Sequence, residues 1–329
     1  MKMLRIGVTI LAAIITLLSL YILFSPKPTA IFVKRMFEGG VAIKPANYDD
    51  IEKKTKSWND LDYASNYGDG FLDIIVPKDN SEKVPVVLWI HGGAFVGGDK
   101  KDITEYAVQI ASHGYAVVNM NYELAPGGNY PKPLQQIDEV YQFIEQNAEK
   151  YKLNLDQLYI AGDSAGAQIA SQYINIQVNA NYAEKTELKA VVPADTIKGA
   201  LLFCGPYDIQ AFGESSDSKL MNFIFKRVGW AYIGERNWLD HPTTKLASTI
   251  DHVSADYVPT FITDGNEGSF EEQGKALTEK LTTLYVPVTS IFYEKDEAVL
   301  GHEYQFMMNT KQAEHTFEEL IQFLDARTE

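Results

Sequence analysis

The sequence predicts an α/β protein whose mostly parallel central sheet carries helices on both faces. From about residue 70, short β-rich runs alternate with longer segments whose apolar residues recur at helical spacing. Residues 84–90 form a continuous apolar run, as expected of a strand buried on both faces. The chain has 329 residues, of which 46% are hydrophobic and 22% charged, so it can form one large domain with an insertion.

Strands and helices follow each other along this domain, which we expect to occupy residues 70–329. The predicted strands are 71–76, 84–90, 115–122, 158–161, 198–204, 260–263 and 286–293. The predicted helices include 133–151, 165–178, 271–284 and 316–324. Between about 209 and 257 the alternation stops and aromatic and polar residues mix, which indicates a cap-like insertion over the carboxyl edge of the sheet. Residues 29–69 are predicted to be a polar connector with some helical character.

The N-terminus is predicted to be a membrane anchor over residues 1–28. Lys2 and Arg5 precede an uncharged run from 6 to 24, and a helix of that length spans roughly 28 Å, close to the thickness of a bilayer. A cleaved signal peptide is the alternative, but it has a shorter apolar core and a small-residue cleavage site.

Charges flank this segment on both sides. Lys2 and Arg5 favour a cytoplasmic N-terminus, whereas Lys27, Lys34 and Arg35 follow the span and oppose that orientation. Because anchors followed by a large domain usually export it, we expect a single-pass protein of the cell membrane with its folded domain outside the cytoplasm.

Composition excludes several classes of partner. A net charge of −15 argues against nucleic acid and against an anionic lipid surface. The single cysteine, Cys204, excludes an internal disulfide framework and a cysteine-rich zinc site. It stands in an apolar run, so we expect a buried, inert thiol. No cluster of metal ligands is visible, and we expect no metal.

Residues 162–166 read Gly-Asp-Ser-Ala-Gly, between the predicted strand 158–161 and a helix starting at Ala165. A nucleophile on so sharp a turn takes a strained backbone conformation, which small residues two positions away on each side permit. The pentapeptide alone would occur by chance in roughly one such chain in ten, given about 7% glycine. Its placement between strand and helix makes Ser164 the predicted nucleophile, and Asp163 is expected to be structural.

A second glycine motif ends the run 84–90, where residues 91–93 read His-Gly-Gly. Acyl transfer develops negative charge on an oxygen, which fixed backbone N–H groups stabilise, and glycines let the backbone approach it closely. The expected oxyanion donors are Gly92, Gly93 and Ala165, the last also at a helix N-terminus.

Three motifs in this order resemble the hormone-sensitive-lipase-like esterase and lipase branch of the α/β-hydrolases. They are His-Gly-Gly at 91–93, Tyr-Glu-Leu-Ala-Pro at 122–126 and Gly-Asp-Ser-Ala-Gly at 162–166. The likeness runs from about Asp73 to the C-terminus, with Gly127 standing where the family often has glutamate. It implies a hydrolase sheet, a triad in the order Ser, Asp or Glu, His, and carboxylic ester hydrolysis without a cofactor.

His302 is the predicted base. Of the six histidines it alone follows the last strand and precedes the terminal helix, where the resemblance also puts the base. It would take the proton of Ser164 and return it to the leaving group. His91 is expected to order the oxyanion loop.

The acid of the triad is displaced. The resemblance places an aspartate three residues after a small residue that follows the seventh strand, and that position falls on Gly268. Glu267 and Asp264 are the candidates: Glu267 has the longer reach and the closer match, and Asp264 the better-fixed backbone. Asp264 has an alternative role as a turn former before Gly265. Asp208, after the sixth strand, is a third option, although related chains often have a structural aspartate there.

These residues predict a membrane-anchored serine carboxylesterase that acts on small-molecule short acyl or acetyl esters through an acyl-enzyme on Ser164. One alternative is the same machinery acting on amide or peptide bonds or deacetylating a cell-envelope polymer. Another is a catalytically inactive binding module, which the displaced acid favours and the intact Ser164 and His302 oppose.

Overall fold

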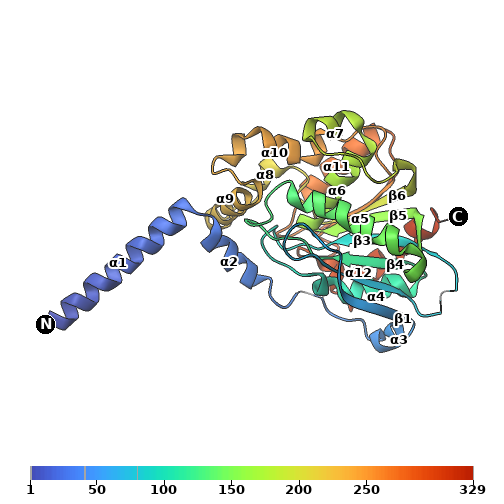
Figure 1. Cartoon of the computed structure of the whole chain (residues 1–329), viewed down its shortest axis with the longest axis horizontal. Helices are drawn as coiled ribbons and strands as arrows, with labels where there is room; N and C mark the ends of the chain where they lie inside the picture. The colour runs from blue at the N-terminus through green and yellow to red at the C-terminus, as the bar shows by residue number, and fades with distance from the viewer. Residues whose placement is uncertain (1, 41, 80, 329) are drawn as a thin grey trace.

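The computed structural model describes residues 2–40, 42–79 and 81–328. Its centre is an eight-stranded sheet in the order β1-β2-β4-β3-β5-β6-β7-β8 (Figure 1). The strands are β1 (Thr55–Asp62), β2 (Phe71–Pro77), β3 (Val84–Ile90), β4 (Ala116–Met120), β5 (Leu153–Asp163), β6 (Ile197–Phe203), β7 (Thr260–Asp264) and β8 (Val288–Phe292). β2 pairs antiparallel with β1 and β4, and the other neighbours are parallel.

Helices cover both faces of the sheet. The helices are α1 (Lys2–Phe24), α2 (Lys27–Met36), α3 (Tyr48–Glu52), α4 (Thr104–Ser112), α5 (Lys132–Tyr151), α6 (Ala165–Val178), α7 (Ala180–Thr186), α8 (Ile209–Phe212), α9 (Lys219–Ile233), α10 (Pro242–Ala247), α11 (Glu271–Thr283) and α12 (Lys311–Asp325). Short 3-10 turns lie at η1 (Lys100–Ile103), η2 (Ala194–Thr196), η3 (Trp238–Asp240), η4 (Thr249–Asp251) and η5 (Tyr304–Phe306).

Two apolar cores lie on opposite faces of the sheet. Side chains of α5, α6 and α11 fill one of them, and side chains of α3, α4 and α12 fill the other. β3 and β4 are buried almost throughout, which explains their unbroken apolar sequences. The predicted fold class, a mostly parallel sheet flanked by helices, is confirmed.

The sheet begins earlier in the chain than the sequence indicated. β1 lies inside the segment predicted as a connector and pairs with β2 from Thr55 opposite Pro77 to Asp62 opposite Phe71. Most of its side chains are exposed, so it lacks the apolar run that marked the other strands. The same segment supplies α2 and α3, and the predicted domain start at residue 70 is therefore too late.

The predicted insertion at 209–257 is helical. It contains α8, α9 and α10, and α9 packs against α2 from the other end of the chain. Arg227 of α9, largely buried, donates to the backbone oxygens of Ile22 and Ser25 where α1 ends. The cap is thus built from the insertion together with the segment that follows α1.

Helix α1 projects away from the body of the molecule and buries none of its side chains (Figure 1). It is long and apolar enough to cross a membrane, with a mean hydropathy of 2.5. A signal sequence near the N-terminus can meet the same criteria of length and hydropathy.

Candidate active site

Ser164 stands on a strained turn between β5 and α6. Its φ is +50° and its ψ −120°, a conformation rarely adopted by residues with a side chain. The turn is closed by glycines, because a Cβ at Gly162 would collide with the backbone of Gly166, and one at Gly166 with the carbonyl of Ile90. The sequence thus places the Ser164 hydroxyl at the carboxyl edge of the sheet.

His302 lies within hydrogen-bonding distance of this hydroxyl. Its Nε2 is 2.9 Å from Ser164 Oγ, and its side chain reaches the site from the loop between β8 and η5. Burial lowers the pKa of His302 from 6.5 to about 4. The imidazole is therefore neutral at pH 7, so Nε2 can accept the proton of Ser164.

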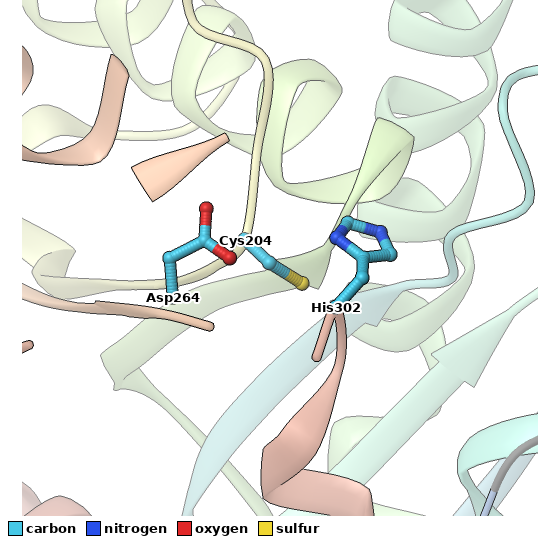
Figure 2. Close-up of side chains that lie close together, drawn as sticks. All are labelled: Cys204, Asp264 and His302. Carbon is cyan, nitrogen blue, oxygen red and sulfur yellow. The ribbon is translucent and has the colours of Figure 1, made fainter. Parts of the chain in front are cut away.

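The other ring nitrogen faces Ser269, a residue that the sequence did not single out. His302 Nδ1 is 2.6 Å from Ser269 Oγ, and the same hydroxyl donates a hydrogen bond to Asp264 Oδ1. Asp264 ends β7 with 2% of its surface exposed, and its Oδ1 also accepts from the N–H of Gly265 at 2.7 Å. Burial raises the pKa of Asp264 from 3.8 to about 8, against the hydrogen bonds from Ser269 and the backbone. Figure 2 shows Asp264 and His302 on either side of the Cys204 thiol.

The other two candidate acids lie elsewhere. Glu267 is exposed, and within the described ranges its carboxylate makes no hydrogen bond or ion pair, while its backbone N–H donates to Leu300. Asp208 accepts from the N–H of Ala211 and caps α8. Of the three carboxylates, the structure thus brings only Asp264 into the hydrogen-bonded chain that ends at Ser164.

Asp163 connects two parts of the site by hydrogen bonds: the oxyanion loop that begins with the motif at 91–93, and the nucleophile elbow, the turn at 162–166. Its side chain is buried and accepts from Trp89 Nε1 at 2.7 Å and from the Gly92 N–H at 2.8 Å. That N–H is therefore occupied, and the prediction of Gly92 as an oxyanion donor is corrected on this ground. A glycine is required at position 92 because a Cβ there would collide with the Asp163 carboxylate.

The remaining predicted donors, Gly93 and Ala165, have N–H groups with no partner among the residues placed by the structure, and so does Ala94. Gly93, Ala94 and Phe95 have φ values of +111°, +52° and +63°, so the loop turns sharply at all three. Ala94 was missed because its motif position is marked by no special residue type. His91 orders the loop as expected: its Nδ1 donates to the Gly92 carbonyl at 2.7 Å, and its ring stacks on Tyr122.

Glu303 is a second carboxyl group that sequence reasoning missed. Its Oε1 is 3.8 Å from His302 Nε2, and the side chain also meets Asp163. Burial and the nearby Asp163 charge raise the pKa of Glu303 well above its usual range, and burial raises that of Asp163 to about 6. This shift favours the protonated form of Glu303, which adds no negative charge beside Nε2.

Cys204, Asp264 and His302 have ligand atoms within 4.8 Å of one another, so they form a possible metal-binding group (Figure 2). Their surroundings do not suit a cation, because both ring nitrogens of His302 and Oδ1 of Asp264 already take part in hydrogen bonds. Burial also raises the pKa of the Cys204 thiol well above its usual range, which disfavours the thiolate that would bind a metal. The arrangement suits proton transfer.

Aromatic side chains form an apolar wall beside the base. The Phe270 ring meets His302 edge-on at 5.6 Å between centroids, and Phe212 lies 5.9 Å from Phe270. Phe225 of α9 packs on Phe212 at 4.8 Å, and Phe95 of the oxyanion loop lies 6.2 Å from Phe212. Parts of the predicted cap therefore reach the catalytic edge of the sheet.

Fold and site together define an α/β-hydrolase with an elbow serine, a histidine in contact with it, and free backbone donors nearby. The BD-FAE family model matches residues 72–281, more than half of the chain. The chain belongs to the BD-FAE family, and the predicted membership of the esterase branch of the α/β-hydrolases is confirmed.

Solved structures share the fold, and curated proteins match parts of the chain. Esterase B from Lactobacillus Rhamnosis superposes with a TM-score of 0.72 at 21% identity, over 92% of each chain. The chain is 31% identical over 147 residues to kynurenine formamidase from Salmo salar, covering 44% of this chain and 45% of the relative. It is 30% identical over 105 residues to acetyl esterase from Salmonella schwarzengrund, covering 32% of each. The chain spans less than two thirds of the length of the curated relatives it matches.

Proposed function

We propose that the chain is a serine carboxylesterase that hydrolyses short acyl or acetyl esters. The observation that carries the proposal is the 2.9 Å contact between Ser164 Oγ and His302 Nε2 on a strained elbow. Nucleophile and base at this distance are the minimum that acyl transfer requires.

The reaction has two halves. Ser164 Oγ attacks the ester carbonyl as its proton passes to His302 Nε2, and the resulting oxyanion is held by the N–H groups of Gly93, Ala94 and Ala165. His302 then gives the proton to the leaving alkoxide, which departs and leaves an acyl-Ser164. Water, deprotonated by His302, attacks this ester, and the carboxylic acid leaves as Ser164 regains its proton. Asp264 is the proposed acid of the triad.

Substrate size is inferred from the aromatic wall. Phe270 contacts His302, Phe212 packs on Phe270 and Phe225 on Phe212, so the base borders an apolar environment suited to a small acyl group. The acetyl esterase relative supports the same choice. Amide cleavage is the second candidate, and the kynurenine formamidase relative is the observation that favours it.

The proposal includes attachment to the cell membrane through α1, with the catalytic domain outside the cytoplasm. The fully exposed apolar surface of α1 supports it, since such a surface is stable in lipid and not in water. Protease treatment of intact cells tests the orientation: export predicts digestion, and complete protection contradicts it.

Replacing Ser164 by alanine tests the mechanism. The variant should lose release of p-nitrophenol from p-nitrophenyl acetate and butyrate, and it should lose labelling by a fluorophosphonate probe. Retained activity would refute the role of Ser164, and a wild-type chain that resists the probe would favour the inactive binding module. Comparing aryl esters with formanilide, peptide and acetylated-glycan substrates separates the esterase from its alternatives.

A further inference from the structure

We propose that Ser269 is a positioning residue through which Asp264 acts on His302, so that one hydroxyl group stands between the acid and the base. This inference rests on the proposed function, since it assigns the support of the base in that reaction. A direct carboxylate–imidazole contact, which the resemblance implied, is replaced by a two-step connection.

The hydrogen bonds leave one consistent arrangement of protons. For His302 to accept from Ser164, Nε2 must be free of hydrogen, so the ring proton resides on Nδ1. Nδ1–H then donates to Ser269 Oγ at 2.6 Å, and the Ser269 proton is directed to Asp264 Oδ1. The Ser164 hydroxyl, the His302 Nδ1–H and the Ser269 hydroxyl then each have one acceptor, and the series ends at Asp264 Oδ1.

The geometry of the loop explains why a hydroxyl is needed. At the position where the resemblance expects the aspartate, Gly268 has no side chain, a φ of +63° and open space around it. Asp264 lies four residues earlier on the fixed end of β7. Ser269, immediately after Gly268, fills the space between the Asp264 carboxylate and the His302 ring.

A structural role such as helix capping does not account for the contacts of Ser269. Helix α11 begins two residues later, and its N-cap position, Phe270, uses no side-chain cap. Within the described part of the chain, Ser269 Oγ makes hydrogen bonds only with Asp264 and His302. The Ser269 hydroxyl is thus committed to the acid and the base.

The connection performs its task without a further proton transfer. When Ser164 attacks a substrate, one proton moves from Oγ to Nε2 and the ring becomes positively charged. The Nδ1–H bond to Ser269 strengthens, and the negative end of the Ser269 dipole, reinforced by Asp264, stabilises that charge. The Ser269 and Asp264 protons stay in place, and the proton on Nε2 leaves with the alkoxide.

The test compares Ser269→Ala with Ser269→Thr in the full-length chain, using p-nitrophenyl butyrate. Ser269→Ala should lower kcat on the order of 10²-fold with KM nearly unchanged, because the ring loses its tautomer control but the substrate contacts remain. Ser269→Thr keeps the hydroxyl and should recover most of that loss. Ser112→Ala is the matched control: among the residues that the structure describes, its part-buried hydroxyl donates only to the Gln109 carbonyl, on helix α4 over the other face of the sheet.

A double variant tests whether Asp264 acts on His302 through Ser269 or independently of it. If Asp264 acts through Ser269, the variant Ser269→Ala with Asp264→Asn should be about as slow as Ser269→Ala alone. Multiplying losses would overturn the proposal, as would a Ser269→Ala enzyme within about twofold of wild type. Loss of the downfield proton resonance of His302 Nδ1–H in Ser269→Ala, with the fold intact by circular dichroism, is the expected spectroscopic result; an unchanged resonance counts against it.

Failure of this proposal differs from failure of the proposed function. An active Ser164→Ala enzyme refutes the function itself. An inactive Ser164→Ala enzyme beside a fully active Ser269→Ala enzyme leaves the function standing and removes only the connection.

Discussion

Replacing Asp264 by asparagine removes a buried ionisable group while keeping an oxygen that can accept from Ser269. Burial raises the pKa of Asp264 from 3.8 to about 8 in the folded protein. The folded state therefore binds this proton more tightly than the unfolded state, and the free energy of unfolding of the wild type falls as pH rises from about 4 to about 8. At about 1.4 kcal/mol per pH unit, the full effect reaches several kcal/mol above pH 8.

The asparagine variant has no such ionisable group, so its free energy of unfolding does not fall with pH for this reason. Its stability relative to wild type should grow steadily between pH 5 and pH 8 and level off above, even though the variant loses activity. Thermal unfolding of both chains in one detergent at pH 5, 7 and 9 measures the difference, and the midpoints should separate by several degrees at the highest pH.

Titratable groups around Asp264 also affect how the stability difference changes with pH. Glu271, Glu303 and Cys204 face Asp264 from α11, the His302 loop and the end of β6, together with His302 itself. Removing the Asp264 charge eases ionisation of Glu303 and Cys204, which adds to the gain at high pH. A difference between variant and wild type that stays constant from pH 5 to pH 9 would refute a raised pKa at Asp264.

Two further outcomes follow from the same site. Glu267→Gln should leave kcat/KM for p-nitrophenyl butyrate within about twofold, because its exposed carboxylate contacts nothing in the site; a loss above tenfold, with Asp264→Asn active, would assign the acid to Glu267. Since burial lowers the pKa of His302 to about 4, kcat/KM should stay high at mildly acidic pH and fall as pH drops through about 4, when the ring is protonated; a fall centred near 6.5 would contradict that burial.

The sequence predicted those features that depend on neighbouring residues. Buried strands such as β3 can be predicted from their unbroken apolar runs. Ser164 can be predicted from the small residues at fixed spacing around its strained turn. His302 could be placed because chain order along a parallel sheet determines which loop reaches the same edge.

What the sequence left open depends on contacts between distant residues. The occupied N–H of Gly92 is visible only once Asp163, 71 residues away, folds against it. Ser269 bonds His302 from 33 residues away and connects it to Asp264, 38 residues away, and no spacing rule links the three. β1 was missed because an edge strand with mostly exposed side chains carries no apolar pattern.

The position of β1 has a practical consequence for preparing a water-soluble form of the protein. A truncation at residue 70, where the apolar pattern begins, would remove β1, which pairs with the outer edge of β2. The backbone groups of β2 would then be unpaired at that edge, which promotes aggregation. It would also remove α2, which packs on α9 of the cap. Truncation just after Phe24 keeps both contacts, so a soluble catalytic domain should start near Ser25.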